Sequence, residues 1–165
     1  MAITDTDLFF LQRCQELRPQ SHDPQRQVAA IIVNQGGQVL GSGTNSAPKA
    51  LRMSQLDSFR AIEDDLNAKY FLLEHAERNA IFAALSSQAH LGQATMYVTN
   101  FPCADCARAI AAVGISRLVA PAPGIQGDRD EKWMEHYRFA QKILDSADVR
   151  VDYFSESLTD FSFAG

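Results

Sequence analysis

Apolar residues recur along the chain first at helical spacing and then in short continuous or alternating runs. Residues 5–17 place apolar side chains on one face and predict an amphipathic helix. The β-branched run at residues 28–33 predicts a buried strand. A glycine-containing turn at residues 34–37 then predicts a return along a partner strand at residues 38–43.

The remaining pattern alternates helices with strands. It predicts helices over residues 55–68, 74–85, 103–113 and 130–146, and strands over residues 94–99, 117–120 and 150–154. The second half therefore contains two strand–helix–strand units, which imply parallel pairing. The expected fold class is α/β, a three-layer α/β/α domain with a mixed five-stranded sheet.

Length and hydropathy are those of one folded unit. We interpret the 165 residues, 46% of them hydrophobic, as a single domain over residues 1–165. No uninterrupted apolar run reaches about 18 residues, so no membrane-spanning helix is expected. The acidic N-terminus lacks the basic-then-apolar order of a secretory signal, and we expect a cytoplasmic protein.

The net charge and the number of cysteines limit which substrates and which cysteine functions are expected. Fifteen basic and 20 acidic residues give a net charge of −5, which favours a small-molecule substrate over long nucleic acid. Three cysteines do not suggest a disulfide framework, so two close cysteines are better candidates for metal ligands or a redox pair.

Cys103 and Cys106 are the informative pair. Pro102 favours a helix start here, and a helix start stabilises thiolates through its free N–H groups. The spacing alone also fits a redox motif or half of a four-cysteine structural zinc site. The chain has no second pair, and we interpret Cys14 as a small buried hydrophobic residue.

His75 and Glu77 open the preceding helix. A neutral His75 imidazole would be a third ligand for Zn²⁺ and would leave a fourth position for water. Glu77, which is not a ligand, would take the proton of that water and return it to the leaving amine. Taken alone, the pair also fits an ordinary helix start with a solvated acid. We interpret the other histidines as surface or hydrogen-bonded residues: His22, His90 and His136.

The two segments together indicate one kind of enzyme, whereas each segment alone fits several kinds of site. His75-Ala-Glu77 and Pro102-Cys-Ala-Asp-Cys106 each open a helix, with one strand between them. This is the H-x-E…P-C-x-x-C pattern of zinc nucleobase deaminases. Both helix starts are expected at the carboxyl ends of strands, where α/β folds place their sites. The candidate metal ligands are therefore His75, Cys103 and Cys106, and the candidate catalytic residue is Glu77.

On these residues the chain resembles the cytidine/deoxycytidylate deaminase family, and its deoxycytidylate (dCMP) branch in particular, over about residues 24–154. The matching segments are residues 23–24, 28–33, 41–45, 69–70, 75–81 (HAERNAI), 96–107 (MYVTNFPCADCA) and 113–118. The resemblance implies a cytidine-deaminase-like fold, a zinc cofactor and hydrolytic removal of ammonia from a cytosine ring, converting dCMP to dUMP. It also implies self-association into dimers or larger rings.

The resemblance further implies substrate contacts. It places Asn45 near the sugar, and the N–H of Ala76 and the peptide oxygen of Phe101 at the base edge. Asn45 also fits a turn residue that caps the end of a strand. Departures at Thr44 and Ser46 fall near the sugar and phosphate side.

The substrate and its phosphate contacts stay open. Basic candidates for a phosphate are Arg26, Lys49, Arg52, Arg129 and Lys132. Alternatives to dCMP are a free nucleoside, a free base such as cytosine or guanine, and a tRNA adenosine, of which the last is disfavoured by the acidic charge. An alternative from another class is a non-catalytic zinc-binding interaction domain, which would have no use for Glu77.

Overall fold

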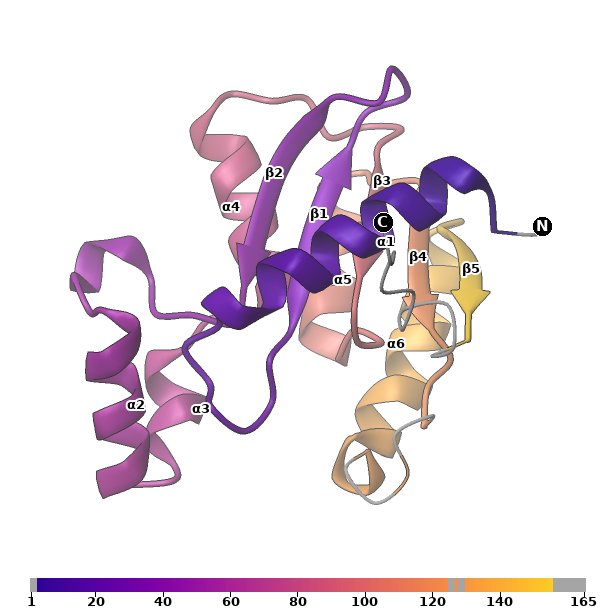
Figure 1. Ribbon diagram of the computed structural model, residues 1–165. Coiled ribbons are helices and arrows are strands. Elements are labelled where there is room, and N and C mark those ends of the chain that lie inside the picture. Colours follow the sequence, from indigo (N-terminus) through magenta and orange to yellow (C-terminus); the bar gives the residue numbers. More distant parts are fainter. Residues whose placement is uncertain (1–2, 125–126, 128–129, 156–165) are drawn as a thin grey trace, which may run out of the picture.

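A five-stranded sheet runs through the middle of the protein (Figure 1). The computed structural model describes residues 3–124, 127 and 130–155. The strands are β1 (Ala29–Val33), β2 (Val39–Thr44), β3 (Thr95–Val98), β4 (Arg117–Pro121) and β5 (Arg150–Phe154). Their order is β2-β1-β3-β4-β5, antiparallel from β2 to β3 and parallel from β3 to β5. The predicted mixed sheet is confirmed.

Helices lie on both faces of this sheet. They are α1 (Asp5–Leu17), α2 (Gln55–Asp64), α3 (Ala68–Leu72), α4 (Ala76–Ser86), α5 (Ala104–Ala112) and α6 (Met134–Ser146), with 3₁₀ turns η1 (Arg18–Gln20), η2 (Lys49–Leu51) and η4 (Glu131–Trp133). The helices α4, α5 and α6 pack on one face, whereas α1 packs on the other (Figure 1). This is the expected α/β/α architecture.

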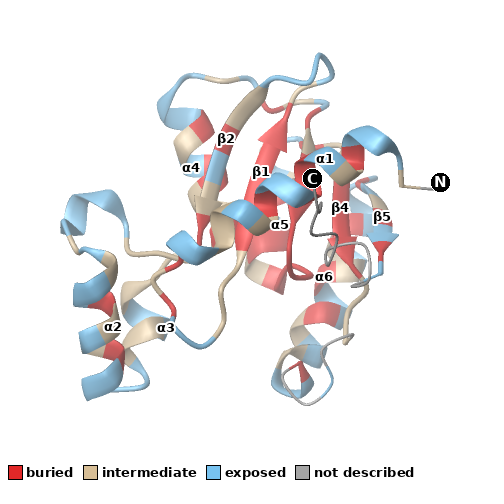
Figure 2. Cartoon of the chain, viewed as in Figure 1, coloured by how far each residue is buried: buried red, intermediate tan, exposed pale blue. Residues whose placement is uncertain are grey.

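The alternation of β1 explains why its run of apolar residues is continuous. Ala30 and Ile32 belong to the apolar cluster with α4, α5 and α6, and Ile31 and Val33 belong to the cluster with α1. Successive side chains of a strand point to opposite faces, so a strand covered on both sides needs apolar residues at every position. Figure 2 shows the resulting burial of the central strands.

Two glycines let α4 approach β2 closely. A Cβ atom at Gly43 would lie 2.6 Å from the Ala80 nitrogen and 2.7 Å from the Ala76 oxygen. A Cβ atom at Gly41 would clash with the Ala80 oxygen. Because backbone atoms of α4 fill this space, glycine at both positions fixes where α4 begins relative to the sheet.

The helix predicted over residues 55–68 begins at the expected residue but ends early, at Asp64. The structure has α2 and α3 instead, because Asp65 adopts extended backbone and its carboxylate accepts the Asn67 N–H at 2.9 Å. Such a local side-chain bond competes with the helical pattern. The apolar residues of this segment do not share one buried face: Ile62 is buried, but Leu56 and Leu66 are 55% and 60% exposed. Both helices lie away from the sheet in Figure 1.

The other boundaries shift by a few residues. The segment predicted as a helix over residues 130–146 begins with the 3₁₀ turn η4 before α6. Gly114, with φ +78°, follows α5, as a residue near the C-terminal cap often does. Within the described residues, no helix combines the length and apolar character needed to cross a membrane. Residues 156–165, which the sequence pattern left unassigned, lie outside the described part.

Candidate active site

The start of α4 is fixed by a short network around His75. His75 is the N-cap residue, with extended backbone at φ −69° and ψ 151°. The Glu74 carboxylate accepts the His75 N–H at 2.9 Å and the Arg78 Nε–H at 2.7 Å. The imidazole is therefore presented from the last extended position before the helix.

A second set of bonds joins this point to the end of β2. Ser46 and Glu74 form an isolated antiparallel bridge, with N···O distances of 3.1 and 3.0 Å. The Asn79 amide donates to the carbonyl oxygens of Thr44 at 2.9 Å and Ser46 at 3.2 Å. The backbone next to His75 is thus tied to both its own helix and the sheet.

Cys103 occupies the corresponding place in α5. It is the N-cap residue, with φ −71° and ψ 170°, and Cys106 lies in the first turn. The loop before it is anchored to β1, because Thr99 N–H donates to the Ala29 oxygen and the Thr99 hydroxyl accepts the Ala29 N–H, each at 3.0 Å. Both cysteines therefore lie at the edge of the sheet where His75 also lies.

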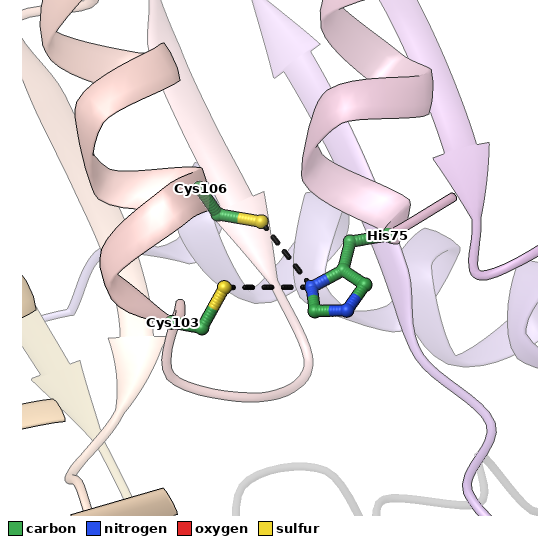
Figure 3. Close-up of side chains that lie close together, drawn as sticks. All are labelled: His75, Cys103 and Cys106. Atoms are coloured by element: carbon green, nitrogen blue, oxygen red, sulfur yellow. Dashed lines mark hydrogen bonds between the residues drawn. The ribbon is translucent and has the colours of Figure 1, made fainter. Parts of the chain in front are cut away.

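These three side chains converge (Figure 3). His75 Nδ1 lies 3.5 Å from Cys103 Sγ and 3.5 Å from Cys106 Sγ, and all three atoms lie within 4.8 Å of one another. Sulfur and nitrogen ligands of tetrahedral zinc, at about 2.3 Å and about 2.0 Å from the metal, lie about 3.5 Å apart. The donor set and its spacing therefore fit one zinc ion with three protein ligands.

Within the described residues, no other group of three or more such side chains gathers in this way. Cys14 is not near the pair: its thiol lies 3.6 Å from the Tyr97 carbonyl oxygen, within the α1 cluster, and is fully buried. This confirms the interpretation of Cys14 as a buried hydrophobic residue. Nothing in the described part supplies a fourth cysteine for a closed structural site.

The three groups shift one another's protonation. Hydrogen bonding from Cys106 is the largest cause that lowers the pKa of Cys103, to about 4, and burial opposes it. The same contact raises the pKa of Cys106 well above its usual value. Hydrogen bonding to Cys103 raises the pKa of His75 to about 9. A thiolate at Cys103 is the form that a divalent cation binds.

Glu77 lies in the first turn of α4 and is 4% exposed. Burial is the largest cause that raises its pKa, to about 6, while the charge of His75 opposes the shift. Glu77, His75 and Cys103 line the same cavity. A carboxyl group with a pKa near neutrality can both accept and return a proton, as the sequence analysis expected of Glu77.

The cavity has a volume of about 570 Å³, within the usual range for small-molecule sites. Its inner wall is partly apolar, with Val28, Phe101 and Trp133. The Trp133 ring lies edge-on to His75, with ring centroids 6.2 Å apart. The cavity wall beside His75 therefore offers aromatic and aliphatic surface.

All three expected substrate contacts line this cavity: Asn45, Ala76 and Phe101. The Asn45 side chain is also structural, since its oxygen accepts from Val28 N–H at 2.9 Å and Ser21 Oγ at 2.6 Å. Its nitrogen donates to the Arg26 oxygen at 2.7 Å, which leaves one N–H proton for another acceptor. Asn45 thus orders the loop before β1 and can only donate to a substrate hydroxyl.

The basic residues named above as candidates for a phosphate differ in where they lie. Arg26 and Lys132 line the cavity, whereas Lys49 and Arg52 are not among the described residues that do, and Arg129 lies outside the described part. The Arg26 guanidinium lies 2.7 Å from Asp130.

Sequence reasoning named no role for Lys69, Tyr70 or Trp133, which also line the cavity. Lys69 and Tyr70 belong to a segment that resembled the family, and that was the only available sign.

Comparison with known proteins agrees with this geometry. The family model for the cytidine and deoxycytidylate deaminase zinc-binding region matches residues 4–122. Human deoxycytidylate deaminase is 37% identical over 99 residues, which cover 60% of this chain and 54% of that protein. The chain thus spans about half the length of that relative.

Two further proteins match most of the chain. The uncharacterized deaminase in the luxG 3′ region of Aliivibrio fischeri is 31% identical over 144 residues, covering 87% of this chain and 90% of that protein. The solved structure of a dCMP deaminase from the cyanophage S-TIM5, in complex with dCMP and dUMP, superposes with a TM-score of 0.67. It is 18% identical and covers 93% of this chain and 100% of that one, which establishes a common fold.

Proposed function

The chain belongs to the cytidine and deoxycytidylate deaminase family, and we propose that it is a zinc-dependent hydrolase that converts dCMP to dUMP and ammonia. One observation supports this most strongly. His75, Cys103 and Cys106 converge at ligand spacing, and Glu77 lines the same cavity without belonging to the group. A purely structural metal site would need neither the cavity nor a buried carboxyl group.

His75, Cys103 and Cys106 would hold the zinc ion. When bound, zinc with three protein ligands supplies Lewis acidity that makes a water molecule more acidic. Glu77 accepts a proton from the attacking water and delivers it to the amine that leaves C4 of the cytosine ring. The exchange balances, because water supplies the new oxygen at C4, one proton that completes ammonia and one proton that ends on N3 of the ring.

The cavity walls would orient the base. The Ala76 N–H, at the start of α4, and the Phe101 peptide oxygen are proposed partners for the polar edge of the ring. Phe101 is itself fixed, since its ring packs edge-on against Tyr137 with centroids 5.6 Å apart. Asn45 is proposed to donate its remaining N–H proton to a sugar hydroxyl.

Ammonia release from a panel of substrates tests this proposal. The zinc-loaded protein is assayed with dCMP, CMP, deoxycytidine, cytosine, guanine and adenosine. We expect the highest kcat/KM for dCMP. Higher activity with a nucleoside or free base would replace the substrate assignment, and no activity with any compound would favour a zinc-binding interaction domain. Self-association and a cytoplasmic location stay predictions.

A further inference from the structure

Asp130 is a buried carboxylic acid just outside the cavity. It is 4% exposed and stands immediately before η4, whose residues Lys132 and Trp133 line the cavity, while Asp130 is not among the described residues that do. Asp130 Oδ1 accepts from Arg26 Nη2 at 2.7 Å and from the Tyr137 hydroxyl at 3.1 Å. A buried carboxylate costs free energy unless such partners compensate its charge, so these contacts determine where Asp130 lies.

The partners of Asp130 are themselves fixed to the rest of the site. The Arg26 carbonyl oxygen accepts from Asn45 Nδ2 at 2.7 Å. The Tyr137 ring packs edge-on against Phe101, with centroids 5.6 Å apart. Through these contacts, Asp130 is held between the loop before β1 and the loop before α5.

Asp130 also holds the backbone of the turn that carries Trp133. The Asp130 carbonyl oxygen accepts the Trp133 N–H at 2.8 Å. The indole itself lacks such an anchor, because its Nε1 is buried without a hydrogen-bond partner among the described residues. The position of the Trp133 ring beside His75, with centroids 6.2 Å apart, therefore depends on packing and on where the turn begins.

We propose that Asp130 is a positioning residue of the cavity wall, which acts through Arg26 to hold Trp133 beside the metal group. The kinetic part of this inference rests on the proposed function. A displacement of about 1 Å in a group that orients a substrate can lower the rate by about 100-fold, so such an anchor matters although it does not line the cavity. The proposal also gives Arg26 a role other than phosphate binding.

Steady-state kinetics of the zinc-loaded protein separate positioning from simple loss of folded protein. Asp130→Asn removes the charge that holds Arg26 but keeps the shape of the side chain. We expect KM for dCMP to rise by about 10-fold, with kcat and zinc content unchanged, because a displaced wall weakens binding. A merely structural role would lower the active fraction, and with it kcat, at unchanged KM. Glu135→Gln, at an exposed acid in the first turn of α6, is the matched control and should change neither.

Tryptophan fluorescence tests the position of the ring without any substrate, because Trp133 is the only tryptophan of the chain. In Asp130→Asn, the emission should shift to longer wavelength and quenching by acrylamide should increase, as the indole becomes more exposed to water. Arg26→Gln removes the same contact from its more exposed side and should give the same shift, also where Asp130→Asn does not fold. The double variant should shift no further than either single one, since both remove one interaction.

Unchanged emission in Asp130→Asn and Arg26→Gln would overturn the proposal, as would an unchanged KM for dCMP in a protein that deaminates it. Loss of zinc from Asp130→Asn would also overturn it, because Asp130 would then support the metal group rather than the wall. Failure of the proposed function is distinguishable. If the wild type deaminates no compound of the panel while both variants shift the emission, the positioning role stands without the reaction.

Discussion

Both faces of the sheet bury cysteines and carboxylic acids, and burial has opposite consequences for Cys103 and Glu77 on one face and for Cys14 and Asp7 on the other. On the face covered by α4 and α5, the pKa of Cys103 falls to about 4 and that of Glu77 rises to about 6. On the face covered by α1, the pKa of Cys14 rises to about 12 and that of Asp7 falls well below its usual range. Burial alone therefore does not decide the protonation of these groups.

Partners explain the difference. Cys14 is surrounded by apolar side chains, so burial dominates and keeps its thiol protonated and unreactive. Cys103 lies beside Cys106 and His75, which together stabilise a thiolate. For Asp7, burial would raise the pKa, but hydrogen bonds led by Arg117 outweigh it. Asp7, bound to Arg117, stabilises the fold as a carboxylate, whereas Glu77, with a pKa near neutrality, remains able to move protons.

The largest effect is expected for Cys103→Ala. The variant should lose stoichiometric zinc and all measurable turnover, and its melting temperature should no longer rise with added zinc. A zinc site gives about 4 kcal/mol of stabilisation at a thousandfold excess over its Kd. Metal analysis and thermal melts with and without chelator measure this. Cys14→Ala, the control from the other face, should keep its zinc. Full zinc content in Cys103→Ala would contradict the ligand assignment.

Substitutions of the two buried carboxylic acids, Glu77 and Asp7, should differ in their effect on kcat. Glu77→Gln should keep its zinc and lower kcat by about 10²- to 10⁴-fold for both dCMP and deoxycytidine, because it removes the proton carrier. Asp7→Asn should leave kcat unchanged. Steady-state kinetics with parallel metal analysis test this pair. A near-normal kcat in Glu77→Gln would disprove the mechanism.

For the free energy of unfolding, Asp7 should matter more than Glu77. Asp7 accepts hydrogen bonds from Arg117 at 2.6 and 2.9 Å and from the Tyr97 hydroxyl at 2.8 Å. Asp7→Asn should therefore lower the free energy of unfolding by about 1 to 3 kcal/mol, measured by urea titration. The exposed Asp5, in the same helical turn, is the control, and Asp5→Asn should have little effect. Equal effects of the two substitutions would show that the Arg117 contact is not stabilising.

The smallest effect concerns acid pH. Since the pKa of Asp7 in the folded state lies below its ordinary value of 3.8, the pairing stabilises the fold at higher pH. That contribution declines as the pH falls below about 3.8 toward the folded-state pKa. Unfolding free energies of wild type and Asp7→Asn should therefore converge in acid. A constant difference down to the lowest pH would exclude Asp7 as the group responsible.

The candidate metal ligands and the candidate acid could be predicted from short segments of sequence. His75 and Glu77, and Cys103 with Cys106, stand at short spacings near the starts of predicted helices, where geometry depends on a few neighbouring residues. The alternation of strands and helices also predicted which edge of the sheet they share. The helix predicted over residues 55–68 ends early, at Asp64, where Asp65 adopts extended backbone and bonds to Asn67, which apolar periodicity does not record.

Residue order and spacing were enough for the α/β class, the mixed sheet and the candidate metal ligands with their acid, since each depends on repeating patterns or short-range contacts. Tertiary structure decided what surrounds them. It paired Arg26 with Asp130 and left Lys132 beside Tyr70 without a described carboxylate partner. It also placed Cys14 among apolar side chains and Cys103 next to His75. Such pairings depend on how distant segments pack, because electrostatic effects fall off with distance in space rather than along the chain.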